Sequence, residues 1–337
     1  MNQNFEFEQT TADSPFRFTL KDWWAVIKRT AVTCQQDNVT VVAAGVAFFS
    51  LLAVFPLISA AISLFSFFAN PTDVDDITET VSALMPGEAF DVIQNQIVTV
   101  LDTPDQALGW GIVISLSVAV FSAGAGIRAM MRAMNIAYQE LEKRNFIVFY
   151  IYAGLMTLGS LMFIWVSLFV IVGIPAFLKF IRLEGLTDMI ARFLPWLLLI
   201  AIFSFATGVM YRFGPSRRPA RKRWVYPGIA FATLSWLLIS YGFSKFVAEF
   251  GNYNATYGSL SAVVILLVWL WLTANVIIVG AELNSELERQ TIADTTRGHV
   301  RALGRRGAFM ADYVASDTAL SDAQDEMINP QETDSVI

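Results

Sequence analysis

Six long runs of apolar residues dominate the middle of this chain. They are apolar on all sides and lack the period-two alternation of a barrel strand. A helix of about 20 residues crosses the ~30 Å apolar core of a bilayer, and helices satisfy their own backbone in lipid. The pattern predicts an all-α polytopic membrane protein, a six-helix transmembrane bundle over residues 39–290. The spans are expected near residues 39–69, 108–131, 146–174, 190–213, 225–247 and 258–281.

The N-terminal region and the first span carry further signals. After a polar segment over residues 1–18, residues 19–38 have the spacing of an amphipathic helix, with Thr19 as its N-cap. Such a helix lies in the cytoplasm or along the headgroups. Pro56 stands inside the first span, where it is expected to kink the helix.

Two polar regions complete the predicted domain organisation. The outer loop over residues 70–107 is long enough for two short helices, near 73–84 and 87–101. The tail over residues 291–337 is polar, and beyond residue 311 it is acidic and poor in large apolar side chains. Such a composition predicts a mostly disordered cytoplasmic tail.

Charge is divided between the connections, and this predicts the orientation. Residues 70–107 contain eight acidic residues and no Lys or Arg, whereas residues 211–224 contain six basic residues and no Asp or Glu. Lys and Arg near span ends favour the cytoplasm. Both termini are therefore expected in the cytoplasm. The third connection, which mixes both signs, is the exception.

Composition excludes several classes of function. Only 15% of the 337 residues are charged and the mean hydropathy is +0.53, whereas soluble domains have roughly 25% charged residues. One cysteine, Cys34, excludes an intramolecular disulfide, and one histidine, His299, cannot build a multi-histidine zinc site. The nucleotide-binding loop and the common hydrolase motifs are absent. We expect no cofactor, no metal, no catalytic residues and no nucleic-acid partner.

Polar residues near the membrane ends are the main site candidates, because charges in a bilayer are costly. Arg128 and Arg132 lie one turn apart at the expected inner end of the second span, and Glu282 and Glu286 at the inner end of the sixth. Asn275 stands two turns from Glu282 on the same face. We hypothesise that some of these residues pair between the two spans. The pair would either lock the bundle or form a gate or headgroup-binding cluster, and absence of contact is the third alternative.

A second candidate cluster lies at the expected outer end of the fifth and sixth spans. Lys245, Glu249, Asn252 and Tyr257 would line an outer vestibule there. The alternative is that Lys245 and Glu249 form an ordinary i,i+4 surface pair.

The run from Gly124 to Ala129 matches the dinucleotide pattern G-x-G-x-x-A. That chemistry needs a strand before the glycines and a helix after them. Here the run falls late in a membrane helix, so the small residues are interpreted as a surface for close helix packing.

Two segments resemble the YihY/BrkB family of bacterial inner-membrane proteins. They are AAGVAFFSLLAVFPL over residues 43–57, and Tyr257-Gly258-Ser259-Leu260 followed by Trp269 and Gly280-Ala281-Glu282-Leu283-Asn284. Phe48-Phe49 departs from the tyrosine that the family often has. The resemblance covers residues 20–290 and implies a six-helix protein of the bacterial inner membrane whose activity is not firmly established. It also implies that the family's old ribonuclease BN label is mistaken, and that movement of envelope lipids or small solutes is a suggested role.

We therefore expect a transporter or translocator of lipid or small solute without its own nucleotide site. The alternative is a non-catalytic membrane scaffold, and a membrane-embedded enzyme ranks last. Candidate partners are the lipid bilayer, a lipid or small-solute substrate and a second copy of the chain. A continuous groove lined by polar residues would favour transport, and a filled bundle would favour the scaffold.

Overall fold

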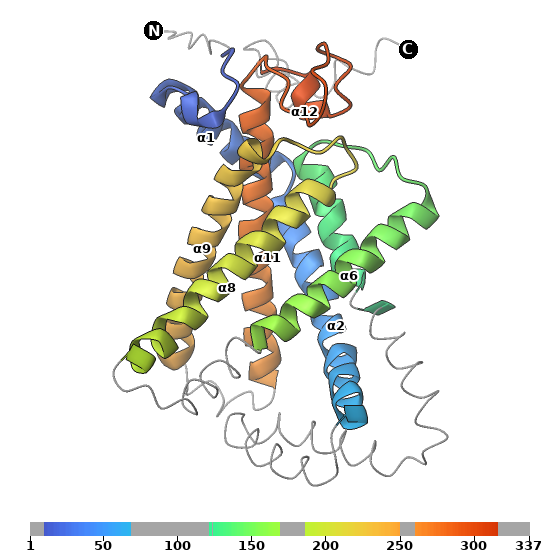
Figure 1. Cartoon of the computed structure of the whole chain (residues 1–337), viewed down its shortest axis with the longest axis vertical. Helices are drawn as coiled ribbons and strands as arrows, with labels where there is room; N and C mark the ends of the chain where they lie inside the picture. The colour runs from blue at the N-terminus through green and yellow to red at the C-terminus, as the bar shows by residue number, and fades with distance from the viewer. Residues whose placement is uncertain (1–9, 69–120, 123, 169–185, 250–259, 316–337) are drawn as a thin grey trace, which may run out of the picture.

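The computed structural model describes residues 10–68, 121–122, 124–168, 186–249 and 260–315. Within these residues every regular element is helical (Figure 1). The elements are η1 (Pro15–Arg17), α1 (Leu20–Gln36), α2 (Val39–Phe68), α6 (Phe146–Leu168), α8 (Leu186–Phe213), α9 (Lys222–Glu249), α11 (Leu260–Arg289) and α12 (Phe309–Asp312). Residues 124–137 are also helical. The predicted all-α class is confirmed.

The long helices coincide with predicted spans. α2, α6, α8, α9 and α11 fall on the first, third, fourth, fifth and sixth of them. Three stretches, in α8, α9 and α11, are each long and apolar enough to cross a membrane, and α1 with α2 supplies a fourth if that bent pair is one span. The chain is therefore a helical membrane protein. That it crosses the membrane six times stays a prediction.

α1 begins as its sequence predicts. The Thr19 side chain accepts from the backbone of Asp22, whose carboxylate accepts in turn from the backbone of Thr19. This capping box satisfies two of the donors that a helix start leaves free. Leu20 and Trp24 are exposed on one face, and Val26 is fully buried on the other. The predicted amphipathic helix is confirmed.

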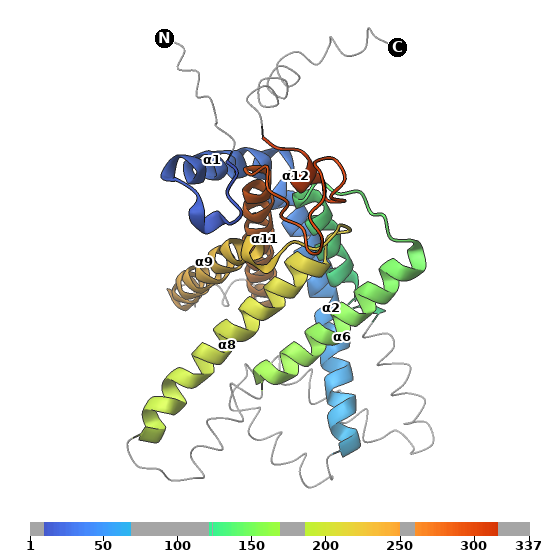
Figure 2. The same cartoon turned by 45° about the horizontal axis from the view of Figure 1, so that its top comes forward.

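The sharp bend of the N-terminal region lies at residues 37–38. The axes of α1 and the following part of α2 differ by 62°, and Asn38 has a φ of 48°, which Asn tolerates better than most residues. α1 therefore lies across the end of the bundle (Figure 2). α2 continues through Pro56 to Phe68, and the expected kink at Pro56 stays a prediction.

α11 runs through the middle of the bundle and packs against α9, α2 and α1 (Figure 1). Glycines bring some of the helices close together. A Cβ on Gly228 of α9 would lie 2.2 Å from the carbonyl oxygen of Gly280 in α11, and one on Gly126 would lie 2.8 Å from the Ser50 hydroxyl of α2. The contact at Gly126 supports the interpretation of the Gly124–Ala129 run as a packing surface.

The segment after α11 is folded, so the expectation of a mostly disordered tail is wrong for residues 291–315. Arg306 is buried and donates to the carbonyl groups of Ile292, Ala293 and Ala311. Asp294 accepts from the backbone and the hydroxyl of Thr296. Hydrogen bonds hold this segment in place. The amino-acid composition shows only that the segment is poor in apolar side chains, so it does not reveal this fold. Residues 316–337 and the outer loop 70–107 lie outside the described residues.

Both described ends of the chain meet at one end of the bundle. The Thr10 amide donates to the Gln290 carbonyl at 3.3 Å, and the Ala315 amide to the Arg289 carbonyl at 3.0 Å. We call this the capped end, formed by α1, residues 214–221 and residues 290–315. Its arrangement agrees with an even number of crossings.

Candidate functional site

The capped end contains a buried ion pair between α1 and α11. Arg29 Nε lies 2.7 Å from a carboxylate oxygen of Glu286, and the two side chains are 2% and 0% exposed. Arg29 also donates to Gln290 at 2.7 Å. The pair forms because α1 lies across the last turns of α11. Removing one partner of such a pair leaves a buried charge and costs about 3–5 kcal/mol.

A second buried pair joins α11 to residues 214–221. Arg217 bonds to both carboxylate oxygens of Glu288, at 2.7 and 2.8 Å, and Thr295 donates to the same carboxylate at 2.6 Å. The Arg217 guanidinium lies 4.5 Å from the centre of the Tyr138 ring. Although burial opposes the charge, the neighbouring Glu288 raises the pKa of Arg217.

Glu282 differs from these paired carboxylates. It is fully buried on α11 beside Asp37 and Thr33, and it forms no ion pair with any described residue. A buried carboxyl group without a cationic partner is costly to ionise. Glu282 therefore remains a candidate site residue.

The structure does not bring Arg128 or Arg132 to these carboxylates. Arg128 lies 5.1 Å from the ring centres of both Phe121 and Tyr150, and Arg132 is exposed. Glu286 is bound instead by Arg29 and, at 3.4 Å, by Arg289. Over the described residues, the hypothesis of ion pairing between the second and sixth spans is wrong, because residues at one depth can face different neighbours.

The other predicted site residues stay apart from this cluster. Asn275 donates to the Trp271 carbonyl of its own helix. Lys245 is exposed and lies 5.9 Å from the Tyr241 ring centre. Asn252, Tyr257 and the side chain of Glu249 lie outside the described residues, so the outer vestibule stays a prediction.

Sequence reasoning missed the role of Asn284. Its amide oxygen accepts from the Gly228 backbone at 2.8 Å, and its amide nitrogen donates to the Val225 carbonyl at 3.2 Å. These groups flank Pro227, which lacks an N–H and disturbs the hydrogen bonds of α9. Asn284 thus clamps α9 to α11 at a proline. Pro227 in a predicted span was the signal that some side chain must bond to the backbone there.

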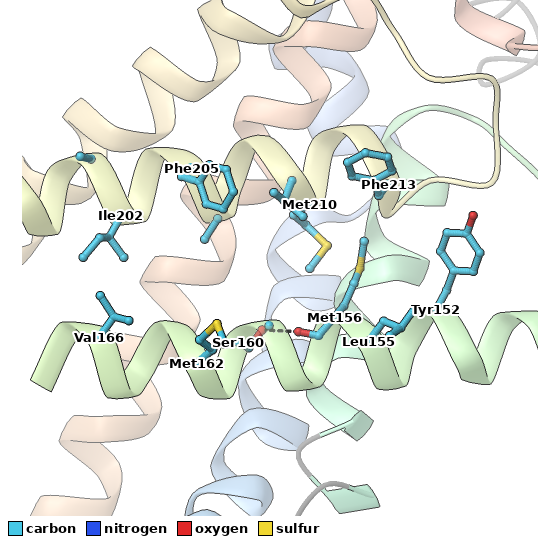
Figure 3. Close-up of a pocket in the computed structure, with 14 residues that line it drawn as sticks. Tyr152, Leu155, Met156, Ser160, Met162, Val166, Ile202, Phe205, Met210 and Phe213 are labelled. Carbon is cyan, nitrogen blue, oxygen red and sulfur yellow. Dashed lines mark hydrogen bonds between the residues drawn. The ribbon is translucent and has the colours of Figure 1, made fainter. Parts of the chain in front are cut away.

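An apolar groove lies between α6 and α8, on the side away from the central helix (Figure 3). Its volume is about 560 Å³, within the roughly 300–1,000 Å³ of ligand pockets. Exposed apolar side chains form much of its wall, among them Leu155, Met162 and Phe205. Ser160, also on the wall, bonds to the Met156 carbonyl of its own helix.

A second cavity of about 340 Å³ adjoins the groove at the capped end, and Tyr152 and Phe213 line both. We call it the basic pocket, because five cationic residues line it: Lys143, Arg144, Arg212, Arg217 and Arg218.

Glu142 holds one wall of the basic pocket by binding Arg144 at 2.7 and 2.8 Å. Arg144 also donates to the Gly214 carbonyl at 2.7 Å. Burial would raise the pKa of Glu142, but hydrogen bonds from Arg144, Asn135 and Ser216 lower it to about 2.

Comparison with known proteins agrees with this architecture. The family profile described as "Virulence factor BrkB" matches residues 30–303. The chain belongs to the BrkB family. The match spans the described helices from the last turns of α1 to the end of α11 and includes the groove, most of the basic pocket and part of the capped end.

Curated relatives of this BrkB protein are similar over most of their length. A UPF0761 membrane protein of Aliivibrio salmonicida is 26% identical over 294 residues, 86% of this chain and 92% of that protein. One from Pseudoalteromonas translucida is 26% identical over 300 residues, covering 88% and 95%. Bacillus subtilis YfkH, named as a ribonuclease-like protein, is 28% identical over 260 residues, covering 73% and 89%. No solved structure matches the chain.

The described residues offer little for metal chemistry. No three of their His, Cys, Asp or Glu side chains come together in a group that could hold a metal ion. What the arrangement offers is an apolar groove that adjoins a basic pocket, beside a tightly packed end of the bundle.

Proposed function

We propose that this BrkB protein is a translocator that binds a lipid in the groove between α6 and α8. The observation that carries the proposal is the groove's apolar wall. A polar solute needs hydrogen-bonding groups in its site, because burying an unpaired polar group is costly. A hydrocarbon chain needs none, and each buried methylene contributes about 0.8 kcal/mol.

The groove does not have the continuous polar lining that would favour transport of a polar solute, and the cationic side chains line the adjoining basic pocket instead. Tyr152 and Ser160 are the polar side chains that line the groove. Its other lining residues are apolar, apart from Gly159, which has no side chain. This separation favours an amphiphile over a small polar solute, because an amphiphile has one part for each environment.

We also propose that the protein resides in the bacterial inner membrane with the capped end in the cytoplasm. Basic residues concentrate at that end, including the five of the basic pocket. Lys and Arg are favoured on the cytoplasmic side of such membranes. No catalytic step is part of the proposal, and the ribonuclease-like name belongs to the Bacillus subtilis relative.

Two glycines of α6 allow a matched test. A Cβ on either Gly159 or Gly154 would meet no atom within 4 Å, but only Gly159 lines the groove. Gly159→Leu should therefore narrow the groove without a clash at its Cβ, and Gly154→Leu controls for the added side chain.

The measurement is transfer of labelled lipids across the bilayer of proteoliposomes. We expect transfer with the unchanged chain and with Gly154→Leu, and at least a several-fold lower rate with Gly159→Leu. Absence of transfer for every lipid and solute in a panel, with insertion verified, would reject translocation and favour the scaffold. Equal rates for the two variants would reject the groove as the path.

A further inference from the structure

The basic pocket carries more positive than negative charge. Three of its five cations have carboxylate partners: Lys143 with Glu140, Arg144 with Glu142 and Arg217 with Glu288. Arg212 and Arg218 form no ion pair with any described residue, so an excess of two positive charges remains.

Arg212 and Arg218 are held by neutral groups. Arg218 donates to the Thr296 hydroxyl at 3.1 Å and to the His299 carbonyl at 3.2 Å. The Arg212 guanidinium lies 5.6 Å from the centre of the Phe213 ring. Both arginines are half-buried, which places their charges at the wall of the pocket rather than in open solvent.

Two buried guanidinium nitrogens in the pocket wall also lack acceptors. Arg212 Nε and Arg217 Nη1 have no hydrogen-bond partner among the described residues. Both nitrogens are closed to the pocket in this structure, so they show only that these side chains are not fully satisfied. A guanidinium with free donors favours an oxyanion, since a phosphate presents several acceptor oxygens to such a planar fork.

The groove adjoins this pocket, because Tyr152 and Phe213 line both cavities. We propose that the two cavities together bind one anionic phospholipid, with an acyl chain in the groove and the phosphate group against Arg212 and Arg218. Basic pockets between membrane helices are suited to anionic headgroups. That a lipid occupies the groove rests on the proposed function. Binding of the lipid, however, does not require that the protein translocates it.

Three substitutions distinguish lipid binding at this pocket from a general attraction between basic residues and anionic lipid. Arg212→Ala and Arg218→Ala each remove a charge that has no carboxylate partner. Lys222→Ala removes one from an exposed residue at the start of α9 that does not line the pocket. Arg212→Lys keeps the charge and so separates loss of charge from loss of the side chain. If Arg212→Ala fails to fold, Arg218→Ala still tests the site.

The experiment measures lipid binding to the purified full chain in detergent by native mass spectrometry. The probes are phosphatidylglycerol, as the anionic phospholipid, and phosphatidylcholine, as the zwitterionic one. We expect phosphatidylglycerol to be preferred, and each Arg→Ala change to weaken its binding by roughly fivefold, as for one charge near an anionic headgroup. Lys222→Ala and Arg212→Lys should retain most of the preference.

A groove variant and a soluble probe complete the design. Gly159→Leu should weaken phosphatidylglycerol binding while Gly154→Leu does not, because only Gly159 lines the groove. Glycerol phosphate should bind much more weakly than the lipid, since it has no acyl chain.

Three results would overturn the inference. They are equal binding of the two phospholipids, equal losses for Lys222→Ala and the arginine variants, and glycerol phosphate binding as tight as that of the lipid. The last would assign the pocket to a free anion. Preferred binding without transfer in proteoliposomes would reject translocation and leave this inference standing.

Discussion

The capped end and the α6–α8 side of this protein are built in opposite ways. At the capped end, charged side chains such as Arg29 and its partner Glu286 are almost fully buried, and in the bundle beside it α9 and α11 touch at glycines. On the α6–α8 side, large apolar residues such as Met162 and Phe205 are more than 70% exposed. In water an apolar face of this kind would be an aggregation hazard, but a bilayer removes that penalty.

The difference shows where the chain tolerates change. The capped end depends on specific partners, since each buried polar group there needs its own bond. The groove side depends on apolar character more than on individual contacts, so it has room for a ligand. Four comparisons between variants test this contrast, from the largest expected effect to the smallest.

Breaking the buried pair should have the largest effect. Arg29→Met leaves the buried Glu286 with only its longer contact to Arg289, at 3.4 Å, and should lower the stability of the folded state by up to about 3–5 kcal/mol. Thermal unfolding in detergent measures the loss. Arg17→Met is the control, because Arg17 and its partner Asp13 are 74% and 49% exposed. Equal losses for the two variants would contradict the claim that burial makes the capped end sensitive.

Alanine at two glycines should have opposite effects. A Cβ on Gly280 would lie 2.3 Å from the Tyr211 hydroxyl and 2.8 Å from the Gly228 carbonyl oxygen, so Gly280→Ala should cost about 1–3 kcal/mol by overpacking. Gly154→Ala on α6 meets nothing and should stabilise its helix by up to about 1 kcal/mol. The comparison fails if unfolding temperatures move in the same direction.

Loss of the clamp at Pro227 should cost a similar or smaller amount. Asn284→Ala leaves the Gly228 N–H and the Val225 carbonyl without their partner, a cost of about 1–3 kcal/mol. Asn275→Ala removes only a bond to its own helix and should cost less. Thermal unfolding of both variants in one detergent decides the order.

The smallest effect should come from Glu142, and it depends on pH. Its pKa of about 2 lies below the ordinary 4.5, so its contribution to stability is full above about pH 4.5 and disappears as the pH falls towards about 2. Glu142→Gln should cost on the order of 1 kcal/mol at neutral pH, because the group is partly exposed. The unfolding temperatures of the variant and the unchanged chain should converge in acid. If the difference between the two unfolding temperatures grew in acid, it would contradict the lowered pKa of Glu142.

Sequence patterns were sufficient for the helices because their signals are local. A run of 20 apolar residues is readable without knowing its neighbours, and so is the capping box at Thr19 and Asp22. The same holds for the glycines that allow close packing, of which Gly126 is confirmed against Ser50.

Partners were harder to predict because they depend on how helices are placed around each other. The depth of Glu286 in its span was readable, but the direction it faces was not. Its partner Arg29 is 257 residues away in sequence and reaches it only because the chain turns by 62° between α1 and α2. Arg128 has a suitable depth but stacks on aromatic rings.

The folded segment 291–315 was missed for a different reason. Composition measures how much apolar surface a segment can bury, whereas this segment is held largely by Arg306, Asp294 and their hydrogen bonds. Hydrogen-bond geometry of that kind leaves no periodic signal in the sequence.

The return of residues 290–315 onto the bundle determines how membrane orientation should be measured. A reporter joined at residue 290, just after the last long helix, would delete Arg306 and the bond from Ala315 to Arg289. The fusion would then report on a damaged protein. Joining the reporter beyond residue 315 keeps the whole cap, so its signal reports the side of the membrane that the intact chain presents.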